Sequence, residues 1–593
     1  MTVDVLVADV GSGKTAAVIE RLTATAKHNP FAQIWVLLPG KRQEDAFRQR
    51  VLEVKDGQRV YFNITFFSFY TLYAHILEMA ALPQRMLDEH ARIQVVQTIL
   101  RELHESNQLR VFHTIADKPG FTRVAARFIY ELKQNMVGPD RFYSVASQRS
   151  GKDYDLALIY AQYQEKLRDH KLVDKEGEGW LAVETLKAQP QLGRNTALLI
   201  ADGFDHFNPL QAELLARLSG EAKETLITLP KVTGREHTVG RRFTAAQQRL
   251  NAEFERLGIE TRLLSLESQF SSTRPITIDH LIHYAFRNQS IVMDCDTHIR
   301  WIEAPSVKQE ARAILRQIKR LLLEGSKPDD VLIAVRDWGQ YGRAFIEAAT
   351  AYQIPIASHY GEALLDSPSM IALLNLLELG DKNFRRRELL DVLRSPYFEI
   401  RGFGTRETDL LERISQQYSI QESQDDWLDG IRNAAVETNA DEDELEAIAL
   451  VSKDEAEALH TRLRDFFERI TPPENMSVTG YVKWVESLMG HDTTIDPDDG
   501  DATMLAEDSL DMLKRVRTGQ TSIVVRDLSA LKIFKRILKQ MQTTQYLFSN
   551  VFEGQSNLTS WNIFFNNLKN MLAAEIMERN TGRSGKVLVT TVT

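Results

Sequence analysis

Short apolar runs alternate with amphipathic stretches over the first 80 residues. An apolar run over residues 3–7 leads into a glycine-rich loop, and a helical pattern through Val18, Ile19 and Leu22 follows. Two further apolar runs, at residues 34–38 and 63–69, are each followed by a helical pattern. Strands and helices that alternate at this spacing are typical of a parallel sheet with both faces covered. The pattern therefore predicts an α/β fold.

The pattern changes to a purely helical one between residues 83 and 189. One apolar stripe there recurs at i, i+3, i+4, i+7, i+8 and i+11, which is the spacing of one helix face. It comprises Phe121, Val124, Ala125, Phe128, Ile129 and Leu132. We predict a helical insertion that packs on the first sheet.

Apolar runs typical of strands return at residues 197–201 and 225–229. The stretch from 231 to 298 is polar and poorly periodic, and we interpret it as the rest of the first α/β region with a linker. A second α/β pattern follows, with a helix at 310–323, a strand at 331–335 and a helix at 345–352. Residues 384–579 are again helical, and a last strand is expected at 586–593. Because complete domains seldom end inside a core strand, we expect the chain to be a fragment.

The glycine-rich loop carries the first candidate chemistry. Gly11-Ser12-Gly13-Lys14-Thr15 stands between the first strand and a helix that begins near Ala16, which is the setting of a phosphate-binding P-loop. Glycines let backbone N–H groups converge on phosphate oxygens, and the helix directs its positive end to the same anion. Lys14 would reach the β- and γ-phosphates of ATP, and the Thr15 hydroxyl would hold Mg²⁺. One departure is Ala8, which replaces the usual first glycine.

Asp202 is the second candidate. It follows the apolar run at 197–201, where a P-loop enzyme needs an acid that holds Mg²⁺ through water. We therefore predict Lys14 and Asp202 as catalytic groups and Thr15 and Asp202 as magnesium ligands.

Composition limits the remaining classes. The 593 residues carry a net charge of −10, and the single cysteine, Cys295, excludes an iron–sulfur cluster held by cysteines of this chain. No apolar run approaches the ~18 residues of a membrane span, so no membrane partner is expected. The first residues lack a basic region followed by an apolar one, and the first strand begins two residues in, so we expect no signal peptide and a cytoplasmic protein.

Several motifs show a resemblance beyond the P-loop. The segment from Asp202 to Leu215, DGFDHFNPLQAELL, resembles motif II of the UvrD/Rep superfamily 1 helicases. Thr65, Phe66 and Ser68 lie in a segment that resembles the helicase segment that touches single-stranded DNA. Val335-Arg336-Asp337 is similar to motif IV, and the resemblance implies that Arg336 points at the nucleotide from the second lobe.

The combination is more specific than any single motif. The DGF version of motif II, with Lys118-Pro119-Gly120-Phe121 and the segment Leu393–Phe398, is similar to AddB (RexB), the B subunit of the AddAB helicase–nuclease. That resemblance implies two RecA-like P-loop NTPase lobes, 1A and 2A, each with a largely helical insertion, 1B and 2B. Lobe 1A would span 1–80 and 190–290, 1B 81–189, 2A 298–383 with 580–593, and 2B 384–579.

The resemblance also implies function. It implies ATP and Mg²⁺ as cofactors, single-stranded DNA and duplex ends as ligands, and an AddA-like protein as the partner in a heterodimer. The expected role is the processing of double-strand break ends for recombinational repair. The nuclease domain of the family, with its iron–sulfur cluster, has no counterpart in this sequence.

The departures bear on hydrolysis. Where active superfamily 1 motors have a glutamate that orients the attacking water, this chain has Gly203, and Asp205 replaces a glutamine. No arginine finger of motif VI is present. Losing these groups costs orders of magnitude in rate, so we expect ATP binding with weak hydrolysis.

Three other hypotheses for the function stay open: an autonomous superfamily 1 motor, a P-loop NTPase unrelated to DNA, and a scaffold without nucleotide-dependent activity. At the level of single residues, Phe66 could stack a DNA base, although aromatic residues in a strand are more often core. The run Arg385-Arg386-Arg387 could meet phosphates, or it could be a solvated helix start. His206, beside Asp205, is expected to have a structural role.

Overall fold

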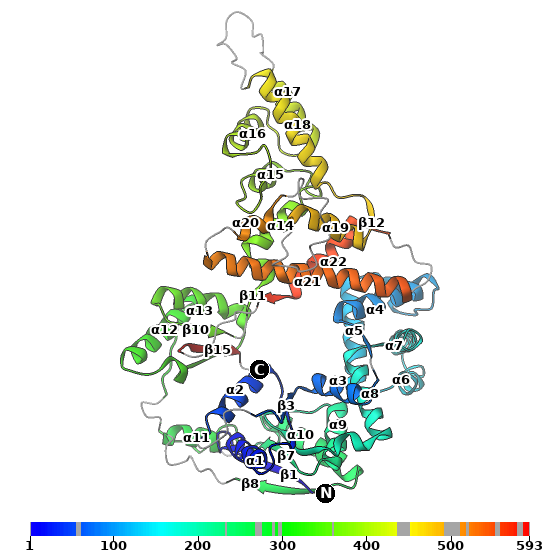
Figure 1. Cartoon of the computed structure of the whole chain (residues 1–593), viewed down its shortest axis with the longest axis vertical. Coiled ribbons are helices and arrows are strands. Elements are labelled where there is room, and N and C mark those ends of the chain that lie inside the picture. Colours follow the sequence, from blue (N-terminus) through cyan, green and yellow to red (C-terminus); the bar gives the residue numbers. More distant parts are fainter. Residues whose placement is uncertain are drawn as a thin grey trace, which may run out of the picture. The chain divides into compact units, whose positions relative to one another are not determined.

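The computed structural model describes residues 2–54, 61–82, 84–231, 234–266, 275–287, 291–294, 299–358, 361–435, 451–490, 510–517, 521–551, 558–577 and 585–591. Cys295 and residues 592–593 lie outside this described part. The chain divides into two compact units, Met1–Arg300 and Trp301–Thr593 (Figure 1). None of the described helices is long and apolar enough to cross a bilayer.

The first unit is built on a parallel sheet of six described strands in the order β3-β2-β6-β7-β1-β8. The strands are β1 (Thr2–Ala8), β2 (Gln33–Leu37), β3 (Ile64–Phe67), β6 (Thr196–Ala201), β7 (Thr225–Pro230) and β8 (Glu260–Ser265). Their apolar residues alternate between two cores, so both faces of the sheet are buried. The predicted α/β class is confirmed.

Six helices belong to this sheet region: α1 (Lys14–His28), α2 (Lys41–Leu52), α3 (Phe69–Met79), α9 (Pro209–Glu221), α10 (Arg241–Arg256) and α11 (Ile276–Tyr284). Helices α1 and α2 contribute to the core on one face. Helices α3, α9 and α10 contribute to the core on the other face. The stretch 231–298, which we expected to hold the rest of the first α/β region with a linker, contains α10, β8 and α11. Helix α10 was missed because its buried face is limited to Ala246, Leu250 and Phe254 among many charged residues.

The region between β3 and β6 is mainly helical, as its apolar pattern predicts. It contains α4 (Glu89–Glu105), α5 (Pro119–Gln134), α6 (Pro139–Ala146), α7 (Gly151–Asp169) and α8 (Lys175–Ala188), with a small sheet of β4 (Arg85–Met86) and β5 (Leu172–Val173). Helix α8 joins this helical insertion to the sheet, because its Ala182, Val183 and Leu186 lie in the same core as α3 and α9.

The predicted buried stripe of α5 is partly wrong. Val124 is exposed, whereas Lys133 is buried on the face that also buries Ala125 and Ile129. The Lys133 ammonium lies 2.5 Å from Asp174 Oδ1, and Tyr163 donates to the other carboxylate oxygen at 2.8 Å. A charged residue of this kind can be buried because its partner and further hydrogen bonds compensate for the lost water.

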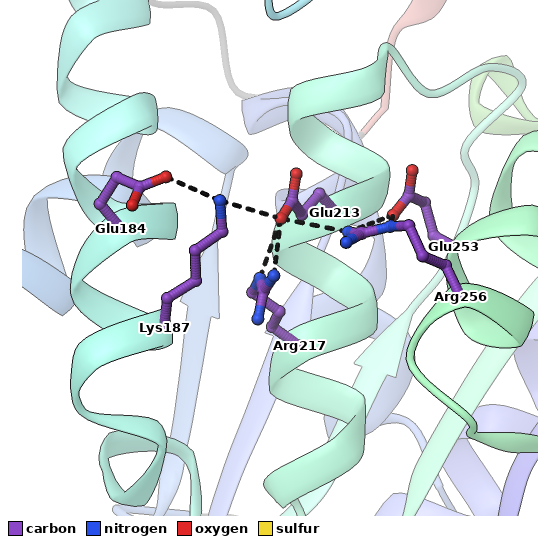
Figure 2. Close-up of polar contacts among 6 residues, drawn as sticks. All are labelled: Glu184, Lys187, Glu213, Arg217, Glu253 and Arg256. Atoms are coloured by element: carbon purple, nitrogen blue, oxygen red, sulfur yellow. Dashed lines mark hydrogen bonds and ion pairs between the residues drawn. The ribbon is translucent and has the colours of Figure 1, made fainter.

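A cluster of ionic side chains holds α8, α9 and α10 together. Figure 2 shows Glu213 of α9 at its centre, with the cations of Lys187, Arg217 and Arg256 around its carboxylate. The closest approaches are 2.8 Å to Arg217, 3.1 Å to Arg256 and 3.4 Å to Lys187. The last helix of the insertion is therefore tied by charge to the helix that follows Asp202.

The second unit contains a smaller parallel sheet with the order β10-β15-β9. It consists of β9 (Leu332–Val335), β10 (Ile356–Ser358) and β15 (Val587–Thr591), and α12 (Val307–Leu323) and α13 (Trp338–Tyr352) share its core. The predicted helix at 345–352 begins earlier than expected, at Trp338, where Asp337 caps it by accepting from the Gly339 N–H at 2.8 Å. The last predicted strand is confirmed as the central strand of this sheet.

The rest of the second unit is mainly helical around one large core. Its helices are α14 (Pro368–Leu377), α15 (Arg386–Leu393), α16 (Thr405–Gln417), α17 (Gln424–Asn433), α18 (Lys453–Ile470), α19 (Val478–Met489), α20 (Met512–Arg517), α21 (Thr521–Val551) and α22 (Trp561–Ala574). Two short antiparallel pairs, β11 (Glu362–Ala363) with β14 (Ile576–Met577) and β12 (Asn475–Ser477) with β13 (Leu558–Ser560), complete it.

Candidate functional site

The glycine-rich loop lies between β1 and α1, as the sequence indicates. Gly11 and Gly13 have φ angles of 72° and 92°, a left-handed conformation that glycine adopts without a steric cost. No side chain caps the first turn of α1, whose N-cap residue is Gly13. Backbone donors at the start of a helix are suited to bind phosphate oxygens. The loop therefore has the backbone features that a phosphate site needs.

Lys14 lies at the same loop. Its ammonium donates hydrogen bonds of 2.8 Å to the carbonyl of Ala8 and 2.9 Å to the carbonyl of Asp9. Burial lowers the pKa of Lys14, and the charges of Asp202 and Asp9 oppose that change. The loop thus holds a partly buried cation beside its own glycines.

Asp202 stands at the end of β6 and is 5% exposed. The Thr15 hydroxyl donates to Asp202 Oδ2 at 2.9 Å, and the Thr228 hydroxyl of β7 donates to Asp202 Oδ1 at 2.5 Å. Strand β7 lies between β6 and β1, so Thr228 of β7 lies between Asp202, which follows β6, and the start of α1, which follows β1. The structure therefore brings Lys14, Thr15 and Asp202 together.

Thr228 is the residue that sequence reasoning missed. It is buried in a strand that is mainly apolar, and a buried hydroxyl is stabilised by a hydrogen-bond partner, which Asp202 supplies here. The Gly203 N–H also donates to its oxygen at 3.4 Å. A threonine in the middle of the core run at 225–229 was the available signal.

Gly203 follows Asp202 with a φ of 82°. This conformation is costly for any residue with a Cβ atom, so the backbone itself disfavours a glutamate at this position. The Asp205 carboxylate is not free to take the place of the missing glutamate, because it contacts His206 at 2.6 Å and Arg242 at 3.0 Å. This contact gives His206 a structural partner.

The predicted DNA-contact residues lie on β3, at the edge of the sheet, and at the start of α3. Thr65 is exposed and Phe66 is half-buried. The guanidinium of Arg48 lies 4.2 Å from the centre of the Phe66 ring, and the Ser68 hydroxyl caps α3 by accepting from the Thr71 N–H. Their contact with DNA stays a prediction.

Arg336 directly follows β9 in the second unit and is exposed. Its predicted contact with the nucleotide also stays a prediction. Arg386 begins α15 and Arg385 pairs with Glu422 at 3.3 Å, so this basic run is a helix start with ionic partners.

The donor set around Asp202 fits Mg²⁺ bound together with a nucleotide. Carboxylate and hydroxyl oxygens are the ligands that this hard cation prefers, and Mg²⁺ at phosphate sites takes one or two protein ligands with the rest from phosphate and water. No group of three or more His, Cys, Asp or Glu side chains in the described part could hold a metal by itself.

Comparison with known proteins shows similarity to one family. Residues 5–271 match the family model described as "ADDB, N-terminal". The B subunit of the ATP-dependent helicase/deoxyribonuclease of Listeria monocytogenes is 22% identical over 460 residues, which cover 72% of this chain and 38% of that protein. The protein of the same name from Bacillus subtilis is 23% identical, over 73% of this chain and 38% of its own length. The corresponding values for Thermoanaerobacter sp. are 22%, 74% and 39%.

The chain spans about two fifths of the length of these curated relatives. The matched region contains the glycine loop, Asp202 and the helical insertion. Residues 5–271 of this chain are thus similar to the N-terminal region of AddB-type proteins.

Proposed function

We propose that this chain is the N-terminal, helicase-like part of an AddB-like component of an ATP-dependent helicase–nuclease. The single observation that carries the proposal is the hydrogen bond from Thr15 to Asp202, which joins the glycine loop to the acid of motif II. The names of the relatives support the same role. The two units would each contain a RecA-like lobe, with the boundaries predicted above.

In this proposal the backbone of residues 11–16 and the Lys14 ammonium bind the phosphates of ATP. Thr15 and Asp202 hold Mg²⁺, which neutralises phosphate charge when it is bound. Thr228 keeps the Asp202 carboxylate oriented through its hydrogen bond. Arg336 would contact the nucleotide from the second lobe.

The proposed hydrolytic activity is weak. Gly203 cannot orient a water molecule through a side chain, and Asp205 is engaged by His206 and Arg242. Since positioning and charge stabilisation supply nearly all of the catalysis in phosphoryl transfer, the loss of a water-orienting group leaves mainly binding. Nucleotide would then stabilise a conformation of the chain instead of driving movement along DNA.

The proposed ligands are single-stranded DNA and duplex ends, and the proposed partner is an AddA-like protein in the cytoplasm. The biological role would be end processing at double-strand breaks before recombinational repair. The segment Thr65–Ser68, at the sheet edge, would form part of the DNA path.

Two titrations test this function with the full chain. Binding of a fluorescent ATP analogue with Mg²⁺ is expected for the wild type and is expected to be lost in Lys14→Ala. Binding of a single-stranded oligonucleotide should weaken steeply with salt, because contacts to phosphates release counterions. ATP turnover that is fast and stimulated by DNA would instead favour an autonomous motor, and turnover indifferent to DNA a different NTPase.

A further inference from the structure

The helical insertion contains a pocket that the proposed ATP site does not use. It lies in the first unit where α3, α4, α5 and the start of α8 meet, and its volume is about 360 Å³. Its wall includes Tyr70, Tyr130 and four cations, Arg92, Arg123, Arg127 and Lys175. This volume is within the ~300–1,000 Å³ range of small-molecule sites.

One face of α5 supplies much of this wall. Arg123, Ala126, Arg127 and Tyr130 follow one another at i, i+3, i+4 and i+7, so they form a single stripe along the helix. Ala126 is the small member, and it leaves space between two exposed guanidinium groups and a half-buried ring.

The carboxylates nearby are already engaged. Glu89 pairs with Arg92 at 2.9 Å, Asp88 accepts from the Ala91 N–H at 2.7 Å, and Asp174 is neutralised by the buried Lys133. Within the described residues, Arg123 and Lys175 pair with no carboxylate. The pocket therefore presents two cations that are available to an anion.

The aromatic side chains lie beside the cations. The hydroxyl groups of Tyr70 and Tyr130 are 3.2 Å apart, and Tyr70 also donates to Glu176 Oε1 at 3.2 Å. The Lys175 ammonium is 5.6 Å from the centre of the Tyr70 ring, and the Arg92 guanidinium is 5.4 Å from that of Tyr130. These contacts fix the two phenol groups at one side of the pocket.

We propose that this pocket binds one nucleotide unit of single-stranded DNA, with the base against the Tyr130 ring and the flanking phosphates on Arg123 and Lys175. Base–aromatic stacking next to a basic surface is the general chemistry of single-strand binding. The inference rests on the proposed DNA function. It gives the main aromatic contact to Tyr130, which lines the pocket, instead of Phe66, which does not. The Arg48 guanidinium also lies closer to the Phe66 ring centre, at 4.2 Å, than Arg92 lies to that of Tyr130, at 5.4 Å.

The test uses the full chain and a sixteen-nucleotide oligo(dT) labelled with fluorescein, followed by anisotropy over a range of salt concentrations. The double variant Arg123→Gln/Lys175→Gln is expected to bind more weakly and to reduce the salt slope by about 1.4, at about 0.7 for each phosphate on a single strand. Arg101→Gln is the matched control, because Arg101 is an exposed arginine of α4 outside the pocket.

Tyr130 separates stacking from its hydroxyl contact. Tyr130→Ala is expected to bind oligo(dT) about tenfold more weakly, whereas Tyr130→Phe, which keeps the ring, should bind nearly as the wild type does. An oligonucleotide that contains 5-iodouracil should crosslink to Tyr130 or Tyr70 on irradiation. A competition experiment compares free dTMP with unlabelled oligo(dT) as competitors of the labelled oligonucleotide. If dTMP competes as strongly as the oligonucleotide, the pocket is a site for free nucleotides, and the assignment to a DNA strand is wrong.

The outcomes distinguish this site from the wider proposal. If the wild type binds oligo(dT) but the double variant and Tyr130→Ala bind equally well, the pocket assignment is wrong and the DNA function stands. If the wild type binds no single-stranded DNA, both are wrong. Circular dichroism of each variant shows whether its fold is intact, and the crosslink to the unmodified chain does not depend on any substitution.

Discussion

The Thr15 hydroxyl donates a hydrogen bond of 2.9 Å to Asp202, although 187 positions separate the two residues in the sequence. Strand order explains the contact. Strands β6, β7 and β1 are neighbours in a parallel sheet, so their carboxyl ends lie side by side at the same end of the sheet. The loop after β1 and the acid after β6 therefore meet there. Ligands of open α/β sheets bind at the carboxyl ends of the strands.

The first prediction concerns this contact. Thr15→Val keeps the shape of the side chain but removes the hydroxyl, so Mg²⁺-dependent binding of a fluorescent ATP analogue should weaken by about tenfold or more. Binding measured with EDTA should change little, since the backbone phosphate contacts remain. Thr23→Val is the control, because the Thr23 hydroxyl of the same helix bonds to the Glu20 carbonyl instead. Equal Mg²⁺ dependence in Thr15→Val and the wild type would contradict the predicted role of Thr15.

The second prediction concerns Gly203. An added Cβ atom would lie 3.6 Å from Pro39, which is ordinary contact, so the cost of Gly203→Ala is conformational. With φ at 82°, the loss in the free energy of unfolding should be about 1 kcal/mol, measured by urea denaturation. Gly203→Glu should not raise ATP turnover, because the same strain opposes the placement of its carboxylate.

Gly120 provides the control for that measurement. It lies in the first turn of α5, and an added Cβ atom would meet no atom within 4 Å. Gly120→Ala should therefore leave stability unchanged or raise it by up to about 1 kcal/mol. A Gly203→Ala variant as stable as Gly120→Ala would show that the conformation of Gly203 carries no cost.

The third prediction concerns pH. Burial, with a smaller contribution from the charge of Asp174, raises the pKa of Glu176 to about 7. An acid with a raised pKa in the folded state binds its proton more tightly there than in the unfolded chain. The contribution of Glu176 to stability is thus fully present below the unfolded pKa of about 4.5 and is lost as pH rises to about 7.

The size of this effect follows from the shift. A rise in pKa from 4.5 to about 7 corresponds to a loss of roughly 3 kcal/mol over the full range of pH. Urea denaturation of the wild type at pH 5 and pH 8 should show most of this loss, since the loss begins near pH 4.5, whereas Glu176→Gln should lose less between the same two values. If Glu176 titrated at its ordinary pKa, the wild type and Glu176→Gln would lose the same free energy of unfolding between pH 5 and pH 8.

The fourth prediction concerns Glu213. Its side chain is 9% exposed, and its carboxylate lies between three cations (Figure 2). Burial opposes its charge, but the hydrogen bond from Arg217 and the nearby cations hold the pKa of Glu213 below its usual value. Glu213→Gln leaves these cations without their central anion, and the free energy of unfolding should fall by about 2 kcal/mol.

Glu184→Gln is the matched control for Glu213. Glu184 also pairs with Lys187, at 2.7 Å, but its side chain is 63% exposed, so its loss should cost less than about 0.5 kcal/mol. Hydrogen exchange adds a second measurement, because loss of the cluster should increase exchange in α8 before it affects β6. Equal stability of the two variants would show that the cluster contributes no more than a surface ion pair.

The sequence predicted what depends on neighbouring residues. The alternation of apolar runs in the first 80 residues identified β1, β2 and β3, since a strand or helix buries side chains with its own period. Prediction failed where burial depends on a distant partner. Lys133 was assigned no buried role and Val124 was placed in the core, because the burial of Lys133 depends on Asp174, 41 positions away. Helix α10 was missed for a related reason, since charged residues such as Arg249 and Arg256 dominate its sequence.

By itself the sequence determined the class of the fold, the glycine-rich loop between β1 and α1 and the acid at the end of β6, because each of these has a local pattern with a physical cause. The tertiary structure decided which distant groups meet: Thr228 with Asp202, the cations around Glu213, and the two tyrosines beside Arg123 and Lys175. These contacts depend on strand order and on the rotation of each helix. Both follow from packing over the whole unit, which no single stretch of sequence encodes.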